Sequence, residues 1–583
     1  ALPSFRILAQ QAEKMPPCQV QCPNSGDVRG WLGVIAQCGK NGLELDRAYD
    51  KAWEMIAERN PLVATISRIC PHPCEDLCTR RDKDGAVSIN AMERFLGDWG
   101  ISRSLPLPVV DSERHPESIG VVGSGPASLS FAYQMSRRGY AVTVYEKHEL
   151  PGGMLRHAIP DYRLPREILD AEVERLFRLN ISLQRNTDVG SSVRLEELRS
   201  RHRLVFLGLG AQAARDLGIP GEKGPGVMSG IAYLRQRKSR SESLHGQRVL
   251  VIGGGNTAID AARSARRDGA LVTVAYRRGE AEMPAAAHEV ADARKEGIEF
   301  RFLVSPTRVE RENGRIRHVE LQEMRLGEPD EQGRRRPVPV AGELRELTAD
   351  TVIVAVAQAP DWNGIDSTPP VREWLNTEAN GKFADDIWAG GDARGADIAA
   401  AAIAQGRFAA ESAHAELRGQ TRPSAGTDRK PVDRESVRLD YYPGQDRTPS
   451  PRRPESEWLS DPEKEIDQTI SYEQACQEAA RCMSCGQCLD CQKCFMYCNG
   501  AGFTRVEQTS PGNYFVLAPE FQHLFLEGWT VVATCYFFKS QNSVLQKQKR
   551  PRWLKYRTQT FLLNAVSSTL ITRGEEIRGT TRF

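Results

Sequence analysis

Cysteines gathered near residue 490 are the most specific chemical signal in this 583-residue sequence. They follow the spacing C-x2-C-x2-C-x3-C, at which cysteine thiolates bind [4Fe-4S] clusters, and they are Cys488, Cys491, Cys494 and Cys498. Asn499 stands where a proline usually follows this run. Zinc is the alternative, because four thiolates also suit that ion. The pattern predicts one or more [4Fe-4S] clusters near the C-terminus.

A second group of cysteines lies within the first hundred residues, on short stretches between helical patterns. Its members form the motifs C-x3-C-P and C-x3-C-x3-C and are Cys18, Cys22, Cys70, Cys74 and Cys78. On short loops these residues would make poor core residues and good thiolate ligands. Spacings of three are less usual for zinc, so an iron–sulfur cluster is favoured and zinc stays open. Cys38 lies alone in a helical pattern and is expected to be a packed thiol.

Residues 119–146 follow the order strand, glycine turn, helix, strand and acid that is typical of dinucleotide binding. Gly123 allows the tight turn, and Gly125 lets the backbone approach a pyrophosphate at the helix N-terminus. Pro126 and Ala127 open the helix and are also expected to bind the cofactor. Glu146 is placed to accept hydrogen bonds from a ribose 2′-hydroxyl. This unit therefore predicts a site for a nucleotide with a free 2′-hydroxyl, namely FAD.

A second unit begins at residue 248, and its turn is formed by Gly253, Gly255, Asn256 and Thr257. Glu146 lies 23 positions after Gly123, and 23 positions after Gly253 the residue is Tyr276. Arg277 and Arg278 follow, and arginines bind a 2′-phosphate that an acid would repel. The replacement favours NADPH over NADH; a solvated basic strand end is the alternative.

Composition excludes some partners. With 78 basic and 76 acidic residues, no overall field points to nucleic acid. Cysteines in tight clusters, without a recognisable signal peptide, favour metal ligation in a cytoplasmic protein rather than disulfides. No apolar run is long enough to predict a membrane span.

Two further stretches bear on the organisation. Gly391 and Asp392 end a third apolar strand before an alanine-rich helical pattern, where the acid could contact a flavin ribityl chain. Residues 421–468 are rich in Pro, Arg, Asp, Glu and Ser, and residues 421–475 are expected to be an extended linker with little core. Residues 521–583 form a tail to which we assign no role.

Together these motifs resemble the small subunit of bacterial glutamate synthase and its relatives, the NAD(P)H-dependent iron–sulfur flavoproteins. The shared segments include ICPHPCEDLC (69–78), VSINAMERF (87–95), PGGML (151–155), IPDYRLP (159–165), GGGNTAIDAAR (253–263) and AGGDAR (389–394). The resemblance implies an α/β, disulfide-reductase-like pair of nested Rossmann-like domains, an N-terminal helical iron–sulfur domain and a C-terminal ferredoxin-like segment. It also implies that Gly153 and Arg156 bind cofactor and that Glu93 is an iron ligand.

The expected domains are an N-terminal iron–sulfur domain (1–112), an FAD domain (113–243 and 360–420), an inserted NAD(P)H domain (244–359), the linker (421–475), the ferredoxin-like segment (476–520) and the tail (521–583).

One departure from these relatives is informative. They carry an arginine–cysteine–x2–cysteine segment before the N-terminal C-x3-C-P motif, and here that segment occurs instead at residues 481–485. We therefore expect the C-terminal part to fold back, in cis or from a dimer partner, and to complete one of two N-terminal [4Fe-4S] clusters. One set would be Cys18, Cys78, Cys482 and Cys485, and the other Cys22, Cys70, Cys74 and Glu93.

The function implied by the resemblance is electron transfer between NAD(P)H and a redox partner protein, through FAD and clusters, with no catalytic side chain required. The C-terminal extension resembles that of iron–sulfur flavoproteins that serve dissimilatory sulfite reductase in sulfur metabolism. A homodimer is expected. The alternatives are a glutamate synthase small subunit and a non-catalytic electron-transfer scaffold.

Overall fold

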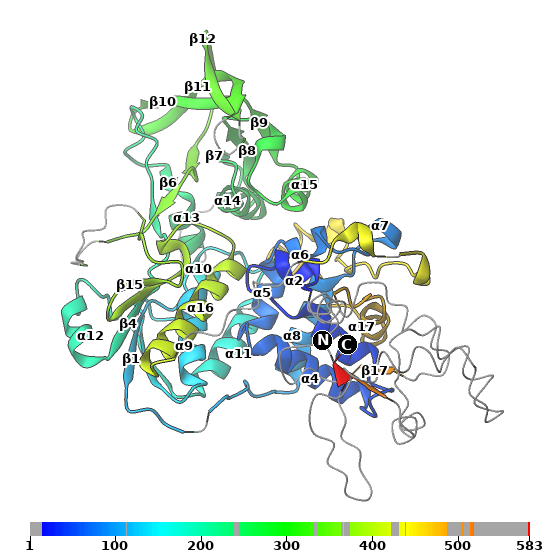
Figure 1. Ribbon diagram of the computed structural model, residues 1–583. Coiled ribbons are helices and arrows are strands. Elements are labelled where there is room, and N and C mark those ends of the chain that lie inside the picture. The colour runs from blue at the N-terminus through cyan, green and yellow to red at the C-terminus, as the bar shows by residue number, and fades with distance from the viewer. Residues whose placement is uncertain are drawn as a thin grey trace, which may run out of the picture.

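The computed structural model (Figure 1) describes residues 14–111, 113–237, 244–329, 333, 335–362, 365, 374–420, 431–437 and 439–486. It also describes the short strands β17 (Phe503–Arg505), β18 (Tyr514–Leu517) and β19 (Thr581–Arg582). The predicted ligands Cys488, Cys491, Cys494 and Cys498 lie outside the described residues, as does nearly all of the expected tail.

Among the described residues of the N-terminal part, seven helices bury large apolar side chains. They are α2 (Pro17–Gln21), α3 (Val28–Ala36), α4 (Leu45–Ala57), α5 (Val63–Ile69), α6 (Pro73–Asp76), α7 (Arg81–Asp84) and α8 (Ile89–Ser102). Asp27 caps α3 by accepting the backbone N–H of Gly30 at 3.0 Å. Helices α5 and α8 approach closely at Gly97, where a Cβ would lie 2.4 Å from the Cα of Ala64. Of the N-terminal cysteines expected on short loops, Cys18 lies within α2 and Cys74 within α6, whereas Cys22 and Cys70 directly follow α2 and α5, and Cys78 lies between α6 and α7.

A six-stranded sheet follows, with the order β15-β16-β4-β1-β2-β3. Its strands are β1 (Ser118–Val122), β2 (Ala141–Tyr145), β3 (Ile181–Gln184), β4 (Leu204–Leu207), β15 (Lys382–Ala384) and β16 (Ile387–Ala389). All neighbours are parallel except β15 and β16. Alternate residues feed two cores: Ile119 and Val121 face one cluster, whereas Val122 joins the other. Both faces of the sheet are therefore buried, as a parallel sheet requires.

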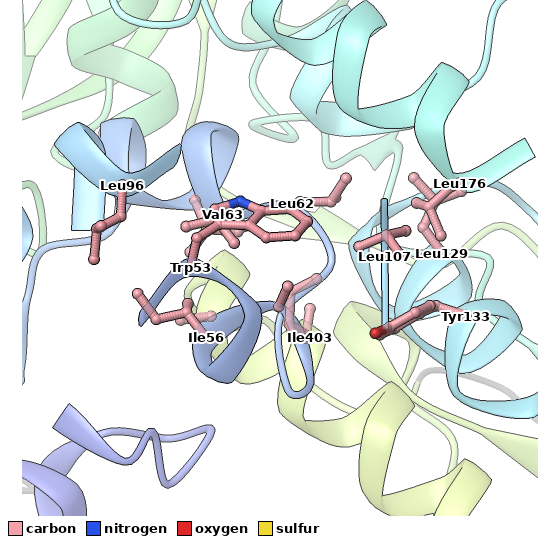
Figure 2. Close-up of a cluster of buried hydrophobic side chains, with 14 of the residues drawn as sticks. Trp53, Ile56, Leu62, Val63, Leu96, Leu107, Leu129, Tyr133, Leu176 and Ile403 are labelled. Carbon is pink, nitrogen blue, oxygen red and sulfur yellow. The ribbon is translucent and has the colours of Figure 1, made fainter. Parts of the chain in front are cut away.

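Helices cover this sheet and join it to the N-terminal part. They are α9 (Pro126–Ser136), α10 (Met154–His157), α11 (Arg166–Phe177), α12 (Leu195–Arg201) and α16 (Ala399–Leu417). Figure 2 shows one continuous core in which Trp53 and Val63 of the N-terminal helices lie with Leu129, Leu176 and Ile403 of α9, α11 and α16. The N-terminal helices and the first sheet are thus packed as one body.

The second sheet is inserted between β4 and β15, with the order β6-β13-β7-β8-β9. It is parallel throughout and contains β6 (Val227–Ser229), β7 (Arg248–Ile252), β8 (Leu271–Tyr276), β9 (Glu299–Phe302) and β13 (Thr351–Val354). Helices α13 (Gly230–Gln236), α14 (Asn256–Arg267) and α15 (Ala287–Lys295) pack around it. An antiparallel sheet of β10 (Val304–Glu312), β11 (Arg315–Pro329) and β12 (Arg335–Leu347) projects from this part (Figure 1). A short pair, β5 (Ala213–Ala214) with β14 (Gln358–Ala359), lies where the chain enters and leaves the insertion.

Residues 439–486, here named the C-terminal return, differ from the expected linker. The stretch has few regular elements, among them α17 (Tyr472–Ala480), but the expectation of little core is wrong. Trp458 is 2% exposed, Ile466 2% and Ile470 3%. The prediction took the many charged residues of this segment to be solvated. Most of the segment is instead held by ion pairs that these residues form with other parts of the chain.

The C-terminal return bridges the N-terminal helices and the second sheet. Glu465 pairs with Arg68 of α5 at 2.8 Å, while Glu463 pairs with Arg237 at 2.6 Å. Arg452 reaches Asp292 of α15 at 2.5 Å. The return therefore fixes the inserted sheet relative to the N-terminal part.

Arg481 anchors the end of the return, and no part of its side chain is exposed to solvent. It donates to Glu478 at 2.6 Å and to the carbonyls of Gly85 and Ala86 at 2.7 and 3.1 Å. Glu478 also accepts the backbone N–H groups of Ser88 and Thr448 at 2.7 and 2.8 Å. A buried ion pair with its remaining hydrogen bonds satisfied thus joins the return to the stretch between α7 and α8.

We predict that Arg481→Met lowers the free energy of unfolding by about 3–5 kcal/mol, because it leaves the Glu478 carboxylate buried without its cation. Urea denaturation followed by circular dichroism measures the loss. The control is Arg434→Met, since Arg434 pairs with Asp82 at the surface and such pairs contribute about 1 kcal/mol or less. Equal losses in the two variants would contradict the role of Arg481 as an anchor.

Candidate active site

The first glycine turn and the returning chain enclose a cavity of about 420 Å³. Among the predicted cofactor-binding residues, those that line it are Gly123, Gly125, Pro126, Ala127, Glu146, Gly153, Gly391 and Asp392. A Cβ on Gly125 would meet no atom within 4 Å, so this backbone faces open space. Gly153 approaches it so closely that a Cβ there would lie 2.8 Å from the Cα of Gly125. The turn fits a pyrophosphate against bare backbone at the start of α9.

Two acids in this cavity have different environments. Glu146 is 4% exposed and already accepts the backbone N–H groups of Ser124 and His148, each at 2.9 Å. These bonds fix its carboxylate at the end of β2, where a ribose would lie. Burial raises the pKa of Asp392 to about 6. The guanidinium of Arg156, also predicted to bind cofactor, instead pairs with Asp170 and donates to the carbonyl of Pro151 at 2.5 Å.

Several residues of the cavity were not predicted as site residues. They include Leu209, Gly210, Asp188 and Asp361. The sequence does contain a signal for Leu209 and Gly210, because β4, which lies beside β1, ends in the small-residue turn Gly208-Leu209-Gly210. Asp188 and Asp361 lie on irregular stretches for which the sequence offers no comparable signal.

The second glycine turn lines a larger cavity of about 1330 Å³. All of the predicted residues of this turn and of the basic strand end line it, namely Gly253, Gly255, Asn256, Thr257, Arg277 and Arg278. Tyr276 stands against Gly254, where a Cβ would lie 2.5 Å from the ring, and its hydroxyl donates to the carbonyl of Glu282 at 2.9 Å. Arg278 donates to the carbonyl of Arg335 at 2.9 Å. A tyrosine and two cations thus occupy the end of β8, where the first unit has Glu146.

The two cavities meet. Met154, Ile159 and Asp392 line both of them. Cys70 lines the second cavity as well, together with Arg452 of the C-terminal return. Two adjoining cavities therefore extend from the first glycine turn, past the second, to a cysteine of the N-terminal part.

Buried ion pairs fix the relative placement of the two nucleotide units. Arg163 follows β2 and α10 in the chain, and it donates to both carboxylate oxygens of Asp260 on α14 at 2.8 Å. It also pairs with Glu289 of α15 at 2.9 Å. The stretch around Arg163 could have been an ordinary surface loop by its sequence alone. The ion pairs of Arg163 instead connect the first nucleotide unit to the inserted one.

Four thiols from both ends of the described chain line one small cavity of about 30 Å³. They are Cys18, Cys78, Cys482 and Cys485. Burial raises the pKa of Cys18, and the three neighbouring thiols raise it further. Burial likewise raises the pKa of Cys485 to about 12. The donor set fits a [4Fe-4S] cluster: each thiol would lose its proton and, as a thiolate, would bind one iron atom.

A second group gathers around Glu93 on α8, and its other members are Cys22, Cys70 and Cys74. Burial raises the pKa of Cys70 to about 12 and also raises that of Cys74, and in both cases Glu93 is the second cause. Burial raises the pKa of Glu93 itself to about 7. Among the described residues, no group of three or more His, Cys, Asp or Glu side chains could hold a metal ion. Both groups therefore fit [4Fe-4S] clusters by the types of their ligand atoms, namely cysteine sulfur and, in the second group, one carboxylate.

No described helix has both the length and the apolar character needed to cross a membrane.

Two family models match the chain. Residues 117–406 match the family described as pyridine nucleotide-disulphide oxidoreductase. Residues 11–105 match dihydropyrimidine dehydrogenase domain II, 4Fe-4S cluster. The predicted nested nucleotide-binding fold behind an N-terminal iron–sulfur domain is thereby confirmed, as are FAD, NAD(P)H and [4Fe-4S] as the types of cofactor.

The curated relatives include three informative proteins. The NADP(+)-dependent formate dehydrogenase subunit beta of Moorella thermoacetica is 37% identical, over 70% of this chain and 61% of its own length. The NADPH-Fe(3+) oxidoreductase subunit beta of Geobacter sulfurreducens is 38% identical, over 59% and 51%. The chain thus spans only half to three fifths of these two relatives. The glutamate synthase [NADPH] small chain of Escherichia coli is 33% identical, over 68% of this chain and 87% of its own length.

Both the nucleotide motifs and the N-terminal cysteines fall within these matches to the family models. The chain belongs to the family of NAD(P)H-dependent iron–sulfur flavoproteins that includes the glutamate synthase small chain.

Proposed function

We propose that this protein moves electrons between NAD(P)H and a protein acceptor or donor by way of FAD and [4Fe-4S] clusters. The observation that carries the proposal is the shared wall of the two nucleotide cavities at Met154, Ile159 and Asp392. A nicotinamide entering from the second turn can reach a flavin held at the first. The names of the relatives, which are subunits of NADP- or NADPH-linked enzymes, support the same activity.

In this proposal the chain binds and orients, and the cofactors supply two-electron and one-electron chemistry. Glu146 would hold the flavin nucleotide ribose, and the backbone at Gly125 its pyrophosphate. Arg163, through Asp260 and Glu289, would keep the nicotinamide domain facing the flavin. No general acid or base is needed for hydride transfer, and we assign none.

We further propose that the two N-terminal ligand groups hold one cluster each. Cys22, Cys70, Cys74 and Glu93 would hold the cluster nearer the flavin, because Cys70 lines the cavity that also contains Asp392. Cys18, Cys78, Cys482 and Cys485 would hold the second cluster, completed in cis by the C-terminal return. From there electrons would pass to or from the cluster predicted at Cys488, Cys491, Cys494 and Cys498.

The cysteine-rich C-terminal extension bears on the identity of the redox partner. We propose dissimilatory sulfite reductase, because of the resemblance carried by the cysteine-rich extension, and a homodimer as the assembly. A second candidate is the electron-input subunit of glutamate synthase, which the coverage of 87% of that small chain favours. Glutamate-forming activity with a large subunit would select the second candidate.

We predict that Cys482→Ser combined with Cys485→Ser removes about four iron atoms per chain, the content of one [4Fe-4S] cluster. Iron analysis and low-temperature EPR on the reduced protein measure the loss. The matched control is Cys38→Ser combined with Cys476→Ser, because Cys476 lies in the same C-terminal return and neither residue lines the thiol cavity. Unchanged iron in the first variant would overturn the proposed completion of the cluster.

We predict that Arg277→Gln lowers kcat/KM for NADPH by about tenfold to a hundredfold, because a charge-assisted bond to the 2′-phosphate contributes roughly 1.5–3 kcal/mol. The value for NADH should stay within about twofold, since NADH has no such phosphate. Steady-state reduction of ferricyanide measures both. The control is Arg315→Gln on the exposed surface of β11. Equal losses with the two nucleotides would exclude Arg277 as the phosphate-binding residue.

A further inference from the structure

One arginine lies on the wall of the cavity that the four thiols of the second cluster site share. Arg29 is on α3, is 4% exposed, and lines this cavity with Cys18, Cys78, Cys482 and Cys485. Its Nη1 donates to the carbonyl of Cys485 at 2.9 Å. Arg29 therefore touches the turn that brings the C-terminal cysteines to the N-terminal ones.

Two further arginines lie near this cavity, and acidic side chains hold both of them. Arg80 also lines the cavity, but both oxygens of the Asp84 carboxylate accept its N–H groups, each at 2.7 Å. Arg481 pairs with Glu478 and with Asp84 at 2.6 and 2.9 Å. Arg29 itself donates to the backbone of Cys485, so its guanidinium lies on the wall of the cavity that the four thiols share.

We propose that Arg29 is a positioning residue that docks the Cys482–Cys485 turn and raises the reduction potential of the cluster bound there. The proposal rests on the proposed function, in which these four cysteines hold a [4Fe-4S] cluster. Four thiolates give such a cluster a net negative charge, and one-electron reduction adds another. A buried cation stabilises the more negative, reduced state more strongly, and net charge and hydrogen bonds are what set cluster potentials. Arg29 would thereby make this cluster easier to reduce from the flavin side.

The test is an EPR-monitored redox titration of the full chain carrying Arg29→Gln or Arg29→Lys. Glutamine keeps an N–H donor for the Cys485 carbonyl but removes the charge, whereas lysine keeps the charge. We expect the potential of this cluster to shift downward in Arg29→Gln and to stay near the wild-type value in Arg29→Lys. The cluster assigned to Cys22, Cys70, Cys74 and Glu93 should keep its potential in both variants. The signal that disappears in Cys482→Ser combined with Cys485→Ser identifies the cluster concerned.

The matched control is Arg453→Gln. Arg453 is also 4% exposed and donates to the carbonyls of Glu457 and Lys464 at 2.9 and 3.0 Å, but it does not line the thiol cavity. It should lower thermal stability without moving the potential of this cluster. A merely structural role of Arg29 would give the same result.

Several results would overturn the proposal. One is an unchanged potential in Arg29→Gln, and another is a shift of equal size in Arg453→Gln. If Arg29→Gln loses the iron of this cluster, Arg29→Lys must retain both the iron and the potential; loss in both variants would leave Arg29 a structural contact only. If the double cysteine variant keeps every EPR signal, the cluster assignment itself fails and the proposal with it.

Discussion

The buried pairing of Arg481 with Glu478 and the stretch around Gly85 is the contact on which the arrangement of the cysteines depends. Cys482 follows Arg481 directly, so the anchor decides where the last two described cysteines lie. Because the arginine and the glutamate are both fully buried and have their hydrogen bonds satisfied, the C-terminal return has one placement rather than many. Two thiols from the C-terminal return thereby reach two from the N-terminal helices, around one cavity.

The same return also contributes to the nucleotide sites. Before it reaches Arg481, its charged residues pair with the N-terminal helices and with the inserted sheet, and Arg452 lines the cavity of the second glycine turn. Arg163 makes an independent connection from the first nucleotide unit to α14 and α15. Two separate sets of ion pairs, from the C-terminal return and from Arg163, thus hold the inserted unit in place. Asp392 of the first unit lines the cavity of the inserted unit as well as its own.

Much of the fold follows from local sequence patterns. The β-branched runs, the glycines at 123, 125, 253 and 255, and the repeated spacing predicted two nucleotide units, and the return of Gly391 and Asp392 to the first cavity agrees with their nesting. These signals are local, because a glycine turn between a strand and a helix needs only a few residues. The residue-by-residue assignment of ligands and of nucleotide contacts stays a prediction.

The parts that sequence reasoning missed depend on pairing over long distances. The C-terminal return was expected to be a linker because its composition is charged, yet its charges find partners hundreds of residues away, as Glu465 does with Arg68. Neither the partner of Arg163 nor the position of Asp361 in the first cavity could be predicted, since no periodicity or motif specifies them. A charged residue in sequence looks the same whether it will be solvated or buried in a pair.

In the proposed function, NADPH, flavin and the clusters form one connected path. An anaerobic titration of the purified protein with NADPH, following flavin absorbance and low-temperature EPR on the same samples, tests it most directly. We expect NADPH to bleach the flavin and reduced-cluster signals to appear in the same samples. A flavin that NADPH leaves oxidised would contradict the path and make this chain a scaffold through which a partner's electrons pass.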